Sequence, residues 1–205
     1  MVKNNKYKRL YIISSLFFVT IICIGFCFFP SEEKKEIMRN VSLLHSRKIS
    51  LPTDQFQVIG EVTDSCYQQN PMKMVIYIDS YICTRCTIKN LATQWKSFVE
   101  KKKYNCVVQF IFIISPGHND IKNVASILKE AQFNHPIYID SLDIFIKKNP
   151  HIPLKGVYHT FLLDENNNVI LIGNPINNKK INRLFQKLIK DKLENMNSHL
   201  DHTSK

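Results

Sequence analysis

An unbroken apolar run near the start of the chain constrains its architecture more than any other feature. Residues 10–29 read LYIISSLFFVTIICIGFCFF and contain no charged side chain. About twenty such residues are needed for a helix to cross the hydrocarbon core of a bilayer. A core helix of a globular domain would carry charges or show a single apolar face instead. We therefore predict a transmembrane helix over residues 10–29.

The flanks of this run predict its orientation. Four basic residues lie between positions 3 and 9, whereas the charges that follow the run nearly balance. The positive-inside bias then places residues 1–9 in the cytoplasm and the rest of the chain on the periplasmic or extracytoplasmic side. The run ends without an Ala-x-Ala cleavage pattern, and neither Cys23 nor Cys27 follows the small residue that a lipoprotein signal requires. Retention is thus favoured over cleavage or lipidation.

Length and composition leave room for one folded domain behind this segment. The chain has 205 residues, of which 44% are hydrophobic, with 5 Gly and 8 Pro, and this composition excludes a disordered or fibrous protein. The net charge of +11 comes from 28 Lys and Arg against 17 Asp and Glu. No basic stripe interleaved with aromatic residues occurs, so nucleic acid is not an expected partner. The dispersed basic residues indicate a solvated surface or an approach to anionic lipid headgroups.

Periodicity after Pro71 predicts a βαβ unit. A short β-rich run at 74–78 is followed by apolar residues at helical spacing over 83–103. The next run, 106–114, is almost continuously apolar, as expected of a parallel strand that is covered on both faces. Strand, helix and strand in this order make the βαβ unit.

The remainder of the chain predicts an inserted helix and strand and then a ββα unit. The β-rich runs of that unit flank Asn166, Asn167 and Asn168, and asparagine suits a hairpin turn because it tolerates left-handed backbone angles. The predicted elements are a helix at 120–131, a strand at 136–139, a brief helix at 142–147, strands at 158–163 and 169–172, and a helix at 179–193.

These patterns divide the chain into five segments. The predicted segments are a cytoplasmic basic segment at 1–9, the transmembrane helix at 10–29, a stalk with N-terminal strands at 30–70, the folded domain at 71–194 and a polar, frayed tail at 195–205.

Cys83 and Cys86 form a CTRC motif where the first strand of the βαβ unit turns into its helix. At the helix N-terminus, unpaired amide groups and the helix dipole favour a thiolate at Cys83, and the charge of Arg85 adds to this effect. A thiolate attacks a disulfide, and Cys86, one turn further on, can attack the mixed disulfide and release the substrate. An extracytoplasmic space, where disulfides persist, suits such a pair.

The chain resembles the thioredoxin superfamily, in particular the membrane-anchored thiol-disulfide oxidoreductases of the bacterial envelope. The resemblance covers about residues 72–193 and is carried by the motifs VIYIDSYICTRC and YHTFLLDENNNVILIGNP. It implies a thioredoxin-like α/β fold, βαβ plus ββα with an inserted helix and strand, behind one transmembrane helix. The implied function is reduction of extracytoplasmic protein disulfides without a cofactor, with electrons from a membrane-embedded thiol partner. The sequence alone leaves reductase, oxidase and isomerase directions open.

Two positions depart from the pattern of this family. Tyr158 or His159 stands where the family has a cis-proline, and Pro153 lies too early. A cis bond before a residue other than proline costs about 3 kcal/mol, so we expect a trans loop. Tyr77 stands where thioredoxins have a buried acid. Asp79 is the nearest carboxylate, and it either relays a proton to the second cysteine or only ends the strand.

Two other functions stay open at this stage. Cys83, Cys86 and His159 could bind a soft ion such as copper(I), because two thiolates and an imidazole suit such an ion. A thioredoxin-like binding protein without turnover is the other alternative, although two intact thiols favour redox chemistry. Cys106 begins an apolar strand and Cys66 lies in a polar loop, so no disulfide is predicted for either.

Overall fold

The structure, a computed structural model, describes residues 11, 14, 15, 17, 31–60, 70–79, 84–101, 104, 107–116 and 121–203. For residues 84, 85, 87, 121–123, 197 and 199–203 it describes the backbone only. Cys66, Cys83, Cys106 and most of the predicted transmembrane run therefore lie outside the described residues. Among the helices in the described ranges, none combines the length and apolarity that crossing a bilayer requires.

The chain forms two compact units, Met1–Asn40 and Val41–Lys205. Helix α2 (Glu32–Leu44) supplies the described part of the first unit beyond residue 17, and its last residues belong to the second. Every strand of the structure lies in the second unit.

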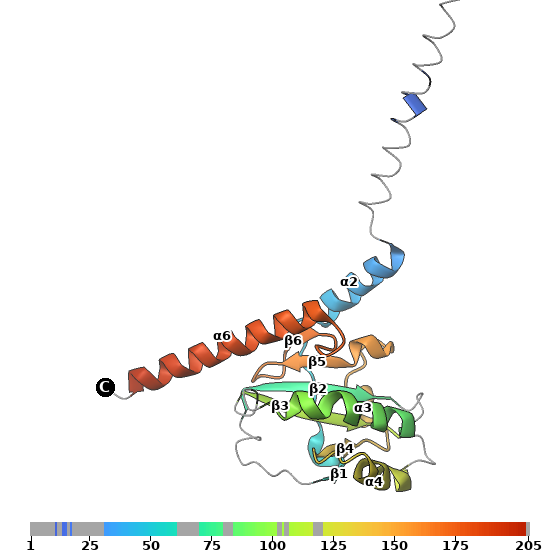
Figure 1. Ribbon diagram of the computed structural model, residues 1–205, viewed down its shortest axis with the longest axis vertical. Helices are drawn as coiled ribbons and strands as arrows, with labels where there is room; N and C mark the ends of the chain where they lie inside the picture. The colour runs from blue at the N-terminus through green and yellow to red at the C-terminus, as the bar shows by residue number, and fades with distance from the viewer. Residues whose placement is uncertain are drawn as a thin grey trace, which may run out of the picture. The chain divides into compact units, whose positions relative to one another are not determined.

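The second unit is built on one six-stranded sheet with the order β1-β4-β3-β2-β5-β6 (Figure 1). β2, β3 and β4 run parallel, whereas β1 pairs with β4, β5 with β2 and β6 with β5 in antiparallel register. The strands are β1 (Gln57–Ile59), β2 (Met72–Ile78), β3 (Val108–Ile114), β4 (Ile137–Ile139), β5 (Thr160–Leu163) and β6 (Val169–Ile172).

The helices complete the order β2-α3-β3, then α4-β4, then α5 and β5-β6-α6. This order confirms the predicted βαβ unit, the inserted helix and strand, and the ββα unit. The remaining elements are α3 (Thr84–Val99), α4 (Ile121–Glu130), α5 (Ile144–Lys148), α6 (Lys179–Thr203) and the 3₁₀ helices η1 (Thr53–Gln55) and η4 (Gly156–Tyr158).

The central strands bury both faces, because successive side chains point to opposite sides of the sheet. Met74 and Ile76 of β2 enter one apolar cluster, which also contains the buried sides of α3, α4 and α6. Val75 and Tyr77 enter a second cluster with Phe145 of α5. Two-sided burial explains why the sequence of β3 is almost continuously apolar.

Aromatic rings fix α3 on the first face of the sheet, where Figure 1 shows it lying across β2 and β3. Trp95 makes edge contacts with Phe98, Phe110 and Phe112, at centroid distances of 5.5, 6.3 and 5.9 Å. Such contacts add to the stabilisation that burial of the rings provides. The position of α3, and with it the start of the helix, is therefore set by its aromatic side.

Several element ends differ from their predicted positions. α3 ends at Val99 rather than at residue 103, because the chain must turn to bury Tyr104 against Phe98 and Phe185. α6 continues to Thr203, beyond the predicted end at residue 193 and through the predicted tail, because the sequence after its start contains no Gly or Pro.

The predicted stalk and the first hairpin strand also differ. Leu44, Ile49 and Phe56, in the segment at 30–70 predicted as a stalk with N-terminal strands, are buried in the second cluster. β1 agrees with the strand part of this prediction, and the segment before this strand also contributes to the folded unit. Tyr158 lies in η4 rather than at the start of β5. The hairpin turn agrees with prediction, since Asn167 has a φ of 65°.

Candidate functional site

The junction between β2 and α3 carries the one cysteine of the CTRC motif that the structure describes. Cys86 is the third residue of α3 and is exposed to solvent. β2 ends at Ile78, so only a short connection separates the carboxyl end of this parallel strand from the start of α3. Ligands and reactive groups of parallel sheets gather at this edge. Cys83 and the side chain of Arg85 lie outside the description.

The loop before β5 is held at the same edge of the sheet. The backbone N–H of Tyr77 donates to the carbonyl oxygen of His159 at 2.8 Å, and the N–H of His159 donates to Gly156 at 3.0 Å. None of the described peptide bonds is cis, so the loop has the trans backbone that the sequence predicts. Tyr158 is only 1% exposed and packs in the second core cluster.

The ring of His159 is buried, and each of its nitrogens lies near an oxygen atom. Nε2 lies 3.0 Å from the carbonyl oxygen of Pro153 and donates to it, because a carbonyl can only accept. Nδ1 lies 3.6 Å from Oδ2 of Asp79. Burial lowers the pKa of His159, while the hydrogen bond to Pro153 and the charge of Asp79 oppose this shift. The imidazole is therefore neutral at pH 7 and carries its hydrogen on Nε2.

Tyr77 packs beside this histidine. Its ring lies 5.1 Å from that of His159 and 5.0 Å from that of Phe145, centroid to centroid. Burial raises the pKa of Tyr77, and the nearby carboxylates of Asp143, Asp140 and Asp79 raise it further, although a hydrogen bond with Ser115 acts in the other direction. The phenol consequently stays protonated throughout the physiological pH range.

Two carboxylates near Tyr77, those of Asp140 and Asp143, accept hydrogen bonds from neighbouring groups. Asp140 is 1% exposed and accepts the backbone N–H groups of Ile144 and Phe145 at 2.8 and 2.7 Å, so it caps the start of α5. Asp143 accepts a hydrogen bond from the hydroxyl of Ser115, at the end of β3. Neither residue is among the site residues expected from the sequence. The available signal was two acids at the first and fourth positions after a parallel strand, at the edge where functional groups gather.

A cavity of about 220 Å³ opens next to these groups. Its lining combines acids, a phenol, an imidazole and apolar side chains, namely Tyr77, Asp79, Asp143, Ile146, Lys147, Leu154 and His159. Within the described ranges, no three His, Cys, Asp or Glu side chains lie close enough to hold a metal ion. The predicted alternative metal set of Cys83, Cys86 and His159 falls partly outside those ranges.

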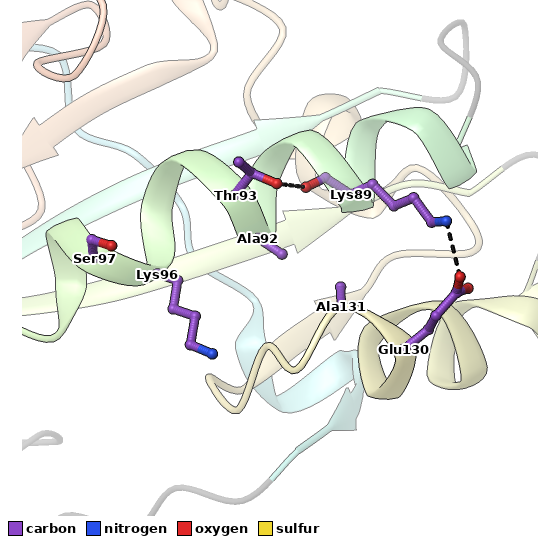
Figure 2. A pocket seen from close by; sticks show the side chains of 7 residues that line it. All are labelled: Lys89, Ala92, Thr93, Lys96, Ser97, Glu130 and Ala131. Carbon is purple, nitrogen blue, oxygen red and sulfur yellow. Dashed lines mark hydrogen bonds and ion pairs between the residues drawn. The ribbon is translucent and has the colours of Figure 1, made fainter.

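A second depression, of about 330 Å³, lies between α3 and α4 (Figure 2). Lys89, one turn after Cys86, reaches across it to Glu130 at 3.0 Å. The hydroxyl of Thr93 donates to the carbonyl oxygen of Lys89 at 2.8 Å. The side chains that line this groove include no cysteine or histidine. Two charged groups of this groove, Lys89 and Glu130, form a salt bridge between α3 and α4, and its lining offers no thiol nucleophile. The edge of the sheet near Cys86 is therefore the stronger candidate site.

The structure thus brings together two of the residues proposed from the sequence, Asp79 and His159, and puts Tyr77 beside them. Asp79 follows the last residue of β2 directly, which agrees with its expected place at the end of the strand. Tyr158, which the sequence offers with His159 at the position of the family's cis-proline and as a modulator of the cysteines, packs in the core and is not among the residues that line the cavity.

No family model and no curated protein sequence matches this chain. Among solved structures it is similar to StoA from Bacillus subtilis, with 21% identity and a TM-score of 0.40 over 51% of this chain and 75% of StoA. It is also similar to a thioredoxin-like protein solved in its oxidized form, with 16% identity and a TM-score of 0.47 over 70% of this chain and 97% of that one. A thioredoxin-like protein from Porphyromonas gingivalis aligns at 10% identity and a TM-score of 0.39, over 62% of this chain and 76% of that one. These likenesses are distant, so the fold assignment relies on the strand order and register of the chain itself.

Proposed function

We propose that the chain is a membrane-anchored thiol-disulfide oxidoreductase that acts on proteins outside the cytoplasm. The observation that carries this proposal is the exposed position of Cys86 in the first turn of α3, at the carboxyl edge of the parallel strands. The CTRC sequence puts Cys83 directly before this helix. A helix N-terminus favours the thiolate form of a cysteine, which is the reactive form.

The proposed reaction needs only the two thiols and a protein disulfide. The Cys83 thiolate attacks one substrate sulfur, the substrate S–S bond breaks, and a mixed disulfide and a free substrate thiolate form. The Cys86 thiolate then attacks the sulfur of Cys83 and displaces the second substrate thiolate. Two electrons pass from the dithiol to the substrate, and a Cys83–Cys86 disulfide remains. In the reductase direction, a membrane-embedded thiol partner returns the two electrons.

Asp79 is the proposed acceptor of the proton that Cys86 must lose before it attacks. Its carboxylate lies at the end of β2, and the neutral ring of His159 lies beside it at 3.6 Å. A carboxylate next to an imidazole whose Nδ1 carries no hydrogen can hold a proton between the two groups. In this proposal His159 positions the loop and supports Asp79, and it does not touch the substrate.

A redox titration tests the proposed reaction. The full chain is equilibrated in glutathione buffers of graded ratio, thiols are alkylated, and the state of Cys83 and Cys86 is measured by peptide mass spectrometry. A two-electron transition is expected, with a midpoint near about −270 mV for a reductase or near about −120 mV for an oxidant. Failure of the two cysteines to form a reversible disulfide would contradict the proposal.

Trapping in cells identifies the substrates and the direction of transfer. A Cys86→Ser variant lacks the resolving thiol, so mixed disulfides with partner proteins should accumulate. The matched control is Cys83→Ser, which should capture no partner. Equal capture by both variants would mean that Cys83 is not the nucleophile.

The copper(I) alternative makes a prediction of its own. The Nε2 of His159 is engaged by the carbonyl oxygen of Pro153, and its Nδ1 faces Asp79. The hydrogen bond of Nε2 leaves the lone pair of Nδ1 for a metal ion, so copper(I) binding would show as sulfur-to-metal charge-transfer absorption that is lost in a His159→Ala variant. If cells that carry the Cys83→Ser variant behave like cells that carry the parent protein, the alternative of a non-catalytic binding protein is favoured instead.

A further inference from the structure

One side of α6 carries a concentrated positive charge. Lys179, Lys180, Arg183 and Lys187 are all exposed. At 100° per residue these four positions fall within an arc of about 100° and extend over about 12 Å of helix. We call these four residues the basic face of α6.

The orientation of this face is fixed by packing on the opposite side of the helix. Phe185 is fully buried in the first core cluster, and Ile189 is 3% exposed there. Ile181 and Leu188 pack partly against the same cluster. α6 lies along the β6 side of the sheet (Figure 1) and cannot rotate without exposing these residues. The basic face therefore points permanently to the outside.

The cations of this face lie four residues or more from the nearest acid of the helix, Asp191. Within the described residues, none of the four takes part in a salt bridge, whereas the neighbouring Lys190 and Lys192 pair with Glu194 and Glu165. Lys179 and Lys180 also occupy the first turn of α6, just after its capping residue Asn178. The positive end of the helix dipole disfavours cations at this position.

We propose that the basic face of α6 binds anionic phospholipid headgroups, an inference that rests on the membrane anchoring of the proposed function. A group of cations on one side of a helix suits a flat, negatively charged surface, and each basic residue near such a surface adds to the attraction. Leu184 is 49% exposed beside these cations, so an apolar side chain is available to enter the headgroup region.

The predicted anchor makes this contact effective. Eleven residues separate the predicted transmembrane run at 10–29 from the folded unit, which begins at Val41, so the predicted anchor would limit how far the domain can move from the bilayer. A tether of this kind raises the effective concentration of the basic face of α6 near the headgroups, so a weak attraction is enough for binding. The contact would hold the domain in one orientation on the membrane, independently of the thiol chemistry.

The test measures lysine reactivity in vesicles. The full chain is reconstituted in phosphatidylcholine alone or with roughly one third phosphatidylglycerol, lysines are acylated, and rates are read by peptide mass spectrometry. Lys179, Lys180 and Lys187 should react about threefold more slowly, or slower still, in the anionic vesicles. The rate for Lys129, an exposed lysine of α4, should stay the same in both. Salt at about 0.5 M should abolish the protection.

A pair of variants provides the control. Arg183→Gln with Lys187→Gln should reduce the protection of Lys179 and Lys180, while Lys101→Gln with Lys129→Gln should leave it unchanged. All four substituted side chains are exposed, so the fold tolerates both changes. Equal rates in the two kinds of vesicle, or protection that survives the first pair or high salt, would overturn the proposal. The purified system contains no other protein. If the basic face of α6 binds an acidic protein rather than lipid, its lysines should therefore show no protection in the anionic vesicles.

Discussion

The ring of His159 connects two segments that lie far apart in the sequence. It donates to Pro153 within its own loop, packs on Tyr77 at the end of β2, and faces Asp79. The sequence singled out this residue only because a histidine stood where a proline was expected. Its hydrogen bond and its neutral state depend on partners that no local pattern reveals.

The lowered pKa of His159 predicts a pH dependence of stability. In the unfolded chain a histidine titrates near about 6.5, whereas the buried ring of the folded protein binds a proton less readily. The unfolded state therefore takes up more protons as the pH falls below this value, and stability decreases by up to about 1.4 kcal/mol per pH unit in that window. Above it, stability should be independent of this group.

Urea denaturation at pH 7.5 and pH 5 checks this prediction. His159→Gln should lose less stability between the two pH values than the parent protein. The remaining dependence belongs to His135 and His151, whose pKa values burial also lowers. An unchanged pH dependence in the variant would show that His159 does not titrate as described.

At the scale of elements, boundaries were predicted less well than the elements themselves. Helices and strands followed from periodicity, because each buries a continuous apolar face. The end of α3 depends on Tyr104 packing against Phe98 and Phe185, which is a long-range contact. α5 depends on a buried acid in the same way, since Asp140 caps it from outside the helix.

Removal of this cap should destabilise the second face of the sheet. Asp140→Ala leaves the N–H groups of Ile144 and Phe145 without their buried acceptor, and we expect a loss of about 2 kcal/mol in the free energy of unfolding. Urea denaturation measures the change. Asp191→Ala, an exposed acid on α6, is the matched control and should change stability by less than about 0.5 kcal/mol.

The aromatic side of α3 allows a second prediction at this scale. Trp95→Ala removes a ring that is 3% exposed and contacts three other rings. Such truncations cost about 3–5 kcal/mol. A chemical denaturation curve should show this loss, and a much smaller loss would mean that α3 is held mainly by other contacts.

At the scale of the whole molecule, α6 is longer than the core requires. Among the described side chains of α6, Leu193 is the last that packs on the first cluster, yet the helix continues to Thr203. A chain that stops after Glu194 should therefore keep its free energy of unfolding to within about 0.5 kcal/mol. A chain that stops after Leu184 loses Phe185 and Ile189 and should not fold, which circular dichroism would show.

The fold class followed from the sequence as a whole, while the site followed only in part. Alternating strands and helices restrict the topology to few choices, so the order of elements could be predicted. The contacts of Asp79, His159 and Tyr77 depend on the loop before β5 returning to the end of β2. This contact joins segments that lie far apart in the sequence, so the spacing of residues along the chain does not predict it.

The central place of β2 in the sheet has a consequence for the order in which the chain can fold. β2 pairs with β3 on one side, but its other neighbour, β5, is synthesised only after a further eighty residues or so. Until β5 arrives, the apolar strand β2 is an open edge, and open edges invite pairing with other chains. Such distant pairings also slow folding. The edge of β2 therefore stays exposed to solvent until the β5–β6 hairpin has been synthesised and pairs with it.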